Sequence, residues 1–407
     1  MTSSSPADPA VCLNSVAAAQ PWRMWAAAWI VTAVFILSNA STPLYVRWQA
    51  EIGFSSATLT IIFSAYILGL LLTLLLAGQL SDRFGRRPVL LPGLAVAIVA
   101  CLLFAGAHSV AMLVMARFLS GIAVGVAVSA GMAAVVDLGG AERRRQAALL
   151  ASVAMVVGAG LGPLLAGGLA LLLPRPVMPI FAIELAILAS AMLIASLLPL
   201  KPGAKTGAGF RLALPAVPRL NRVHIVSGMA VFGPGITATS FVLSLGPSLL
   251  SRLLDVTNPL IAGGMACAMF LAATCVQFLF RGCSVRTILL AGAAATVLSM
   301  TGIAVAVATS SVILLIVASL LAGSGQGLGQ LGGLTLIGLL VPGDRRAEAN
   351  AVLNIGGYTP AGLMPIATGF VIDRAGLLVG ATGFAAALAL AAILGGLAVS
   401  KAAADRS

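Results

Sequence analysis

Residues 57–107 read ATLTIIFSAYILGLLLTLLLAGQLSDRFGRRPVLLPGLAVAIVACLLFAGA, and this stretch holds two long apolar runs separated by a short charged segment. Each run has the roughly 20 residues with which an α-helix crosses the hydrocarbon core of a bilayer. The runs are continuously apolar, whereas the strands of a membrane barrel alternate apolar and polar residues. The stretch therefore predicts two transmembrane helices, over 57–80 and 88–107, joined by a charged loop.

The same alternation of apolar runs and short polar connections extends over the whole chain of 407 residues. Hydrophobic residues make up 60% of the chain and charged residues 8%, whereas about a quarter of the residues of a soluble domain are charged. We expect twelve transmembrane helices, at 24–46, 57–80, 88–107, 110–137, 147–173, 177–199, 224–250, 257–280, 287–308, 311–341, 347–371 and 376–400. The sequence thus predicts an all-α membrane protein whose surroundings are the lipid bilayer.

Glycines, arginines and prolines recur at a fixed offset of 202 positions, which indicates an internal duplication. The matched pairs are Gly121 with Gly323, Gly125 with Gly327, Gly131 with Gly333, Arg143–Arg144 with Arg345–Arg346, and Pro163 with Pro365. Since the pairs fall in corresponding runs, we expect two six-helix halves in parallel orientation, 22–199 and 224–400. The basic stretch 200–223 is the predicted linker, and residues 1–21 and 401–407 are the predicted tails.

The net charge of +12 is distributed by side of the membrane, so we expect no nucleic-acid partner. The basic residues of one set of connections are Arg83, Arg86, Arg87, Arg143, Arg144, Arg145, Lys201, Lys205, Arg211, Arg219, Arg222, Arg281, Arg286, Arg345 and Arg346, whereas the other set holds little beyond Arg47, Arg175, Arg252 and Arg374. Short basic loops are retained in the cytoplasm, so both termini are predicted to be cytoplasmic. Arginine outnumbers lysine 20 to 3, a bias typical of GC-rich bacterial genomes, and we expect a bacterial inner membrane.

Three motifs carry a family resemblance. The charged loop, Gly78-Gln79-Leu80-Ser81-Asp82-Arg83-Phe84-Gly85-Arg86-Arg87, resembles the loop signature Gly-x-Leu-Ser/Ala-Asp-Arg-x-Gly-Arg-Arg/Lys of the major facilitator superfamily. Arg117-Phe-Leu-Ser120-Gly121 resembles a second pattern of that family, with Ser120 in place of glutamine. Gly158, Gly160, Gly162, Pro163 and Gly167 resemble the antiporter pattern of its exporting members, with one extra residue before Gly167. The resemblance implies a secondary transporter with two parallel six-helix halves.

The resemblance also implies a cytoplasmic latch. An arginine of the loop would pair with Asp137, and Asp82 would meet the amino end of the eleventh helix only while the cytoplasmic ends of the two halves touch. The predicted gating residues are Gly78, Asp82, Arg83, Gly85, Arg86, Arg87 and Asp137. The alternative is a solvated loop that does no more than set the topology.

A proton-driven transporter needs an ionisable group inside the membrane, and two charged residues inside apolar runs are candidates. Arg117 and Glu184 are expected at similar depth, roughly 10–12 Å below the outer surface at about 1.5 Å per residue. They are candidates for an ion pair that opens when Glu184 takes a proton. A purely structural pair and a glutamate that reaches the headgroups are the alternatives.

Polar side chains inside the runs outline a substrate path. Asn350, Asn354 and Tyr358 form one stripe because they are four residues apart; the other candidates are Gln326, Gln330, Asn39, Tyr66, Gln277 and Thr237. A path with few formal charges suits amphiphilic substrates that are neutral or weakly charged, although each of these groups could instead pack between helices.

The predicted function is a proton-coupled exporter of small organic molecules, acting as a monomer. An uptake symporter and a non-transporting sensor on the same fold are the alternatives. The sequence holds no Ser/His/Asp, metal-ligand or nucleotide-binding constellation, so we expect no enzyme, no cofactor and no metal.

Overall fold

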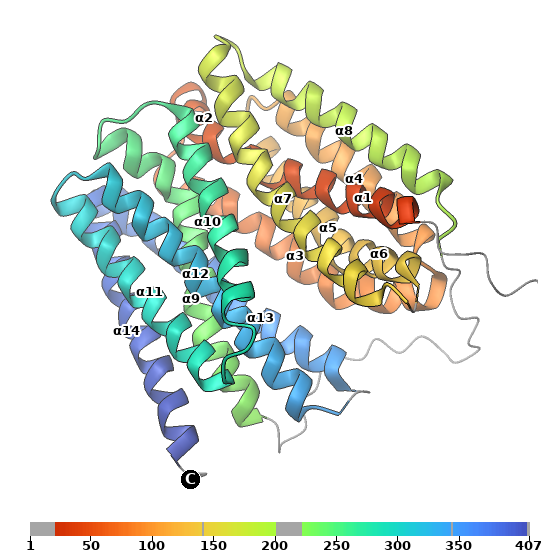
Figure 1. Ribbon diagram of the computed structural model, residues 1–407. Helices are drawn as coiled ribbons and strands as arrows, with labels where there is room; N and C mark the ends of the chain where they lie inside the picture. The colour runs from red at the N-terminus through yellow and green to blue at the C-terminus, as the bar shows by residue number, and fades with distance from the viewer. Residues whose placement is uncertain (1–20, 141, 201–221, 343–344, 405–407) are drawn as a thin grey trace, which may run out of the picture.

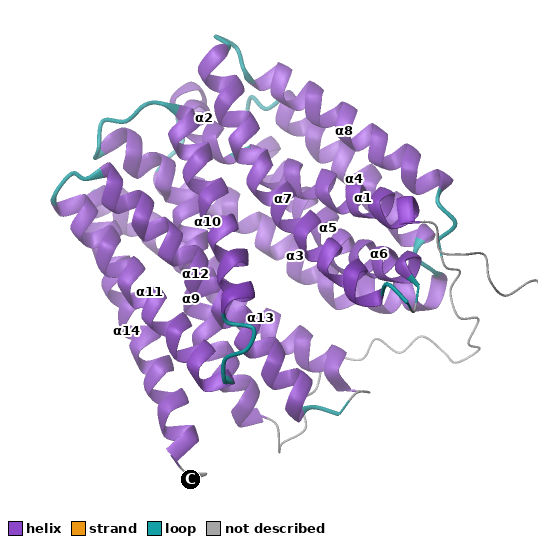
Figure 2. Cartoon of the chain, in the orientation of Figure 1, coloured by secondary structure: helices purple, strands orange, loops and turns teal. Residues whose placement is uncertain are grey.

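The computed structural model describes residues 21–140, 142–200, 222–342 and 345–404, and this part of the chain is built of helices (Figures 1 and 2). Twelve of the described helices are long and apolar enough to cross a membrane. This confirms the predicted all-α membrane class and the predicted number of spans. Nearly all of the predicted tail 1–21, most of the predicted linker 200–223 and the last three residues lie outside the described residues.

The first six spans form one half of the molecule. Their helices are α1 (Pro21–Ala40), η1 (Thr42–Leu44) and α2 (Tyr45–Ile52) in the first span, then α3 (Ser56–Phe84), α4 (Arg87–Ala105), α5 (Val110–Val126) with η2 (Ala127–Gly131) and α6 (Met132–Gly139), α7 (Arg144–Leu172) and α8 (Val177–Leu197). The first span continues six residues past its predicted end at 46, because α2 carries the helix on as far as Ile52. The fourth span contains a π-helical segment, η2, between α5 and α6.

The last six spans form the other half, at the lower left of Figure 1. They are α9 (Arg222–Arg252), α10 (Pro259–Leu279), α11 (Val285–Ala308), α12 (Val312–Leu340), α13 (Arg346–Ala375) and α14 (Leu377–Ala404). α14 runs four residues past the predicted end of the last span at 400, so the helix takes in part of the predicted tail 401–407.

The glycines that recur along the sequence make equivalent contacts in the two halves. A Cβ on Gly121 of α5 would overlap the carbonyl oxygen of Tyr66 on α3, and a Cβ on Gly323 of α12 would overlap the carbonyl oxygen of Met269 on α10. Small residues allow this close approach of helices in lipid. The duplication read from the sequence therefore corresponds to a repeated packing of the second span on the fourth and of the eighth on the tenth.

The two halves meet along two helix pairs, α3 with α13 and α7 with α10. We call the face with the α3–α4, α6–α7 and α12–α13 connections the arginine-rich face, and the other end of the molecule the opposite face. The halves touch near the opposite face: a Cβ on Gly369 of α13 would lie 2.7 Å from the Cα of Ala57, and one on Gly167 of α7 would lie 2.6 Å from the carbonyl oxygen of Pro259.

The glycine contacts predict which substitutions the fold tolerates. Gly323→Ala should lower the thermal unfolding midpoint of the detergent-purified protein, because overpacking a tight contact costs about 1–3 kcal/mol. Gly264→Ala on α10 is the matched control, since its Cβ would meet no atom within 4 Å and alanine favours helix by about 1 kcal/mol over glycine. Equal midpoints for the two variants would contradict this account of the repeat.

Candidate functional site

A cavity of about 550 Å³ lies between the two halves. Its deep end is lined by Asn39, Tyr66 and Arg117, and its wall reaches Leu149 near the start of α7 and the exposed Arg281 just beyond α10. The ends of these helices lie at the arginine-rich face, so the cavity opens toward that face while the halves are in contact at the opposite one. Of the predicted path residues, Asn39, Tyr66, Gln277, Gln326, Gln330, Asn350, Asn354 and Tyr358 line it.

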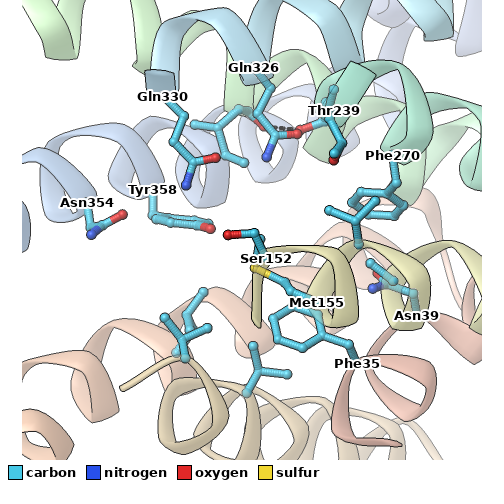
Figure 3. A pocket seen from close by; sticks show the side chains of 18 of the residues that line it. Phe35, Asn39, Ser152, Met155, Thr239, Phe270, Gln326, Gln330, Asn354 and Tyr358 are labelled. Atoms are coloured by element: carbon cyan, nitrogen blue, oxygen red, sulfur yellow. Dashed lines mark hydrogen bonds between the residues drawn. The ribbon is translucent and has the colours of Figure 1, made fainter. Parts of the chain in front are cut away.

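The two halves give the cavity different walls (Figure 3). Gln326 and Gln330 point into it from α12, and the stripe that ends in Tyr358 follows from α13. The Oε1 atom of Gln326 and the Oδ1 atom of Asn350 are buried without a hydrogen-bond partner. Apolar side chains, among them Phe35 and Met155 of the first half and Phe270 of the second, line the remainder. The arrangement suits a molecule with a large apolar body and a few polar groups.

Thr237 is a wrong prediction. Its side chain is fully buried and its hydroxyl donates to the carbonyl oxygen of Gly233 one turn earlier, 2.7 Å away. Thr239 and Ser240, two and three residues further along α9, line the cavity in its place. A hydroxyl in a transmembrane helix can satisfy itself on the backbone of its own helix, as Thr237 does, so its presence does not reveal which face points inward. Ser152 of α7 was missed for the same reason.

The charged loop forms a compact cluster around Arg86. Its Nε donates to Asp137 Oδ2 at 3.1 Å, and its Nη1 donates to Asp82 Oδ1 and to Ser81 Oγ, each at 2.8 Å. Arg86 is thus the loop arginine that pairs with Asp137. Gly85 has a φ of 98°, a conformation that favours glycine, and it lets the chain turn from α3 into α4.

The other residues of the predicted gating motif lie around this cluster. Arg87 donates to the carbonyl oxygen of Ser196 on α8, Arg83 lies against the ring of Phe84, and a Cβ on Gly78 would meet no atom within 4 Å. The side chain of Asp82 is 74% exposed. In this conformation Asp82 therefore engages its own loop, and its carboxylate is available at the arginine-rich face.

A second aspartate holds the opposite face together. Asp373, near the end of α13, accepts hydrogen bonds from the amide of Ser56 at 2.9 Å and from that of Ala57 at 3.0 Å, the first two residues of α3. The third amide of α3, that of Thr58, donates to the side chain of Ser55. The free amides at the start of a helix need such acceptors. One half of the molecule thus caps a helix of the other.

The glycines of the antiporter-like motif face two different neighbours. Gly158 and Gly162 pack on α1, where a Cβ on either residue would overlap the carbonyl oxygen of Thr32 or of Ile36. Pro163 and Gly167, further along α7, pack on α10 of the other half. The motif therefore joins α7 to its own half near the middle of the helix and to the other half near the opposite face.

The predicted ion pair between Arg117 and Glu184 is not formed in this conformation. Arg117, on α5, donates to the carbonyl oxygen of Ser38. Glu184, on α8, is 2% exposed, has no hydrogen-bond partner at Oε2 and lies close to Cys101 of α4. The helix that carries Glu184 packs on α1 and α4, not on α5. Similar depth in the membrane did not bring the two charges together, because they occupy different sides of the half.

Parts of this chain are similar in sequence to known membrane proteins. The family model described as Major Facilitator Superfamily matches residues 24–282. Multidrug resistance protein MdtL of Klebsiella pneumoniae subsp. pneumoniae is 39% identical over 79 residues, which are 19% of this chain and 20% of that protein. MdtL of Escherichia coli O45:K1 is 34% identical over 122 residues, 29% of this chain and 31% of that protein. The match thus spans about a fifth to a third of these relatives.

Solved structures share the fold over nearly the whole chain. The POT family transporter PepTSo gives a TM-score of 0.76 at 14% identity, over 94% of this chain and 98% of that one. A bacterial homologue of the human lysosomal transporter Spinster, in an inward-facing and unoccupied conformation, gives 0.73 at 15% identity, over 95% and 98%.

The contact between Asp373 and the start of α3 predicts a change in conformation. Asp373→Ala should favour states that are open at the opposite face, because a carboxylate at a helix amino end is worth about 0.3–1 kcal/mol, and up to ~2 when partly buried. A loss of about 1 kcal/mol changes a population ratio about fivefold. Electron–electron distances between spin labels at His108→Cys and Thr309→Cys, exposed on the opposite face of each half, should lengthen. Arg374→Ala is the control, and equal distance distributions in the two variants would refute the contact's role.

Proposed function

The chain belongs to the major facilitator superfamily, and we propose that it is a secondary active transporter that exports small organic amphiphiles in exchange for protons. The observation that carries the proposal is the cavity of about 550 Å³, which is lined by both halves and reaches the arginine-rich face. Its mixed apolar and amide lining fits amphiphiles, and the matched relatives are named multidrug resistance proteins. One chain supplies both walls, so a monomer suffices.

The direction of transport follows from the orientation in the membrane. The protein is a multi-pass protein of the bacterial inner membrane, and short loops rich in arginine remain in the cytoplasm. The arginine-rich face is therefore the cytoplasmic face in this proposal, and both termini lie on that side. In the conformation described here the cavity would load its substrate from the cytoplasm, as an exporter requires.

Alternating access is supported by the similar positions of two aspartates on α3 and α13. Each of these helices carries an aspartate near its carboxyl end, Asp82 on α3 and Asp373 on α13. Asp373 caps the amino end of α3 while the opposite face is closed. In the alternative conformation Asp82 would leave Arg86 and meet the amino end of α13, as the family resemblance implies. Each helix would then cap the other in one of the two states.

Proton coupling in this proposal is assigned to Glu184. Among the described residues it is the one carboxylate that is buried, and the described lining of the cavity contains no aspartate or glutamate. An ionised carboxylate in lipid is expensive unless a cation pairs with it. Because Arg117 is not that cation here, the coupling would act through the packing of α8 on α1 and α4.

The test is transport into proteoliposomes with a panel of cationic, neutral and anionic aromatic amphiphiles. An antiporter accumulates its substrate when the lumen is made acidic, whichever way the protein is inserted, whereas a symporter accumulates it when the external medium is acidic. We expect accumulation with the acidic lumen only. Accumulation with the reverse gradient would favour the uptake symporter, and no transport with either gradient would favour the sensor.

Glu184→Gln tests the coupling residue. Since glutamine cannot exchange a proton, this variant should lose accumulation driven by the pH gradient while still exchanging labelled for unlabelled substrate without a gradient. The control is Glu51→Gln, which removes a surface carboxylate that is paired with Arg47. Accumulation by Glu184→Gln at the parental rate would show that the proton binds elsewhere.

Asp82→Asn tests the latch at the arginine-rich face. It should increase the population that is open at that face, the reverse of the shift expected from Asp373→Ala, because the amino end of α13 would lose its anionic cap. Spin labels at Gln146→Cys and Gly282→Cys, exposed on α7 and just beyond α10, report the separation. Glu142→Gln, an exposed neighbour on the same face, is the control. A distance distribution like that of the control would reduce the loop to a determinant of topology.

A further inference from the structure

Arg117 places a charge at the deep end of the cavity without a carboxylate beside it. The residue is 1% exposed, and its Nη1 donates to the carbonyl oxygen of Ser38 on α1. Its Nε and Nη2 are buried and have no hydrogen-bond partner. Arginine stays charged in proteins, and burying a donor or a charge without a partner is costly. Two donor atoms of this charged group, Nε and Nη2, are therefore able to bind a further acceptor.

Three aromatic rings surround the guanidinium. Its carbon lies 5.4 Å from the ring centre of Tyr45, 5.0 Å from that of Phe63 and 5.3 Å from that of Tyr66. Rings at this distance stabilise a cation through their π-faces, and the hydroxyl of Tyr45 also interacts with the guanidinium. Phe63 and Tyr66 also line the cavity. Arg117 is itself one of the residues that line the cavity, beside these two rings.

The described cavity lining has an uncompensated positive charge. It includes Arg117 at the deep end and Arg281 at the rim, and none of the described lining residues is an aspartate or a glutamate. A cation at the closed end of a weakly polar cavity attracts anions, because the low dielectric strengthens the interaction. Because the described lining contains no carboxylate, an anionic partner for Arg117 would have to be part of the bound molecule.

We infer that Arg117 is an anion subsite, and that the substrates are monoanionic amphiphiles whose carboxylate binds the guanidinium. This inference rests on the proposed function, in which the cavity is the substrate path. The apolar body of the molecule would lie along Phe35, Met155 and Phe270. The unpaired Oε1 of Gln326, in the other half, would accept a hydrogen bond from an N–H or O–H group of the substrate. The planar guanidinium matches a carboxylate with two parallel hydrogen bonds.

Binding of matched acids and amides tests this inference. The probes are benzoate, 2-naphthoate and 4-phenylbenzoate with their three primary amides, titrated into the detergent-purified full chain at pH 7.5 by calorimetry. Each pair has nearly the same shape and differs in charge. At least one acid should bind more tightly than its amide by about tenfold or more, the factor that a hydrogen bond to a charged group provides.

Variants then assign the charge preference to one residue. Arg117→Gln should abolish the preference for the acid while the amide still binds, Arg117→Lys should retain part of it, and Arg252→Gln, an exposed change at the opposite face, should retain all of it. Amide binding also reports that the variant is folded. The inference is wrong if no acid binds better than its amide, or if Arg117→Gln weakens acid and amide equally.

The same compounds separate this inference from the proposed function. Transport of amides but not of acids in proteoliposomes would leave the exporter in place and remove the anion subsite. Acid binding that depends on Arg117, without transport of any compound, would leave the subsite and remove the exporter.

Discussion

A carboxylate from one half of this molecule caps the start of a transmembrane helix of the other half, at the face where the halves are in contact. The first amides of α3 have no partner within their own helix, and at the membrane surface they need an acceptor. Asp373 supplies that acceptor from the other half of the chain. These amides consequently form their hydrogen bonds to Asp373 only while the halves are in contact at the opposite face. When the halves separate at this face, water must replace the carboxylate, so the two states differ by a small free energy and can exchange.

The glycines explain why closure at one face produces a cavity behind it. Gly369 and Gly167 bring backbones of opposite halves into contact near the opposite face. Gly121 and Gly323 instead hold each half together internally. Because both halves are close-packed, each would behave as a rigid body in the proposed transport cycle, and contact at one end holds them apart at the other. The cavity is therefore a consequence of two stiff units that meet at one end only.

The sequence predicts the framework better than the interior. The apolar run 177–199 lies within two residues of the observed helix, Val177–Leu197, because its length is fixed by the membrane. The partner of Asp137 was predicted as an arginine of the loop because the family resemblance implies this contact, although Arg86 and Asp137 are 51 residues apart. The separation of Arg117 from Glu184 was not predictable, because a sequence gives depth along a helix but not the direction in which a side chain points around it.

Thr237 illustrates the same limit on a smaller scale. A shift of two residues turns a side chain by about 200° around the helix. Hydroxyl residues occur on several faces of α9, among them Ser240, Ser244 and Ser248 at spacings of four, so Thr237 alone does not show which face points into the cavity. The Gln and Asn stripes succeeded because two residues four apart define a face together. Asp373 carried no such signal. Its role depends on α3, which precedes it by some 300 residues in the sequence and becomes its neighbour only after folding.

The charge of the cavity bears on energetics as well as on recognition. Moving one elementary charge across the membrane is worth about 2.3 kcal/mol per 100 mV. The cytoplasm is the negative side, so an anion that leaves it and a proton that enters it both move with the field. Exchange of one monoanion for one proton transfers two charges in the favourable direction, whereas exchange of a monocation for one proton transfers none. In the proposed exporter, a fixed cation in the path, with no carboxylate beside it in the described lining, would therefore select substrates whose export the membrane potential assists.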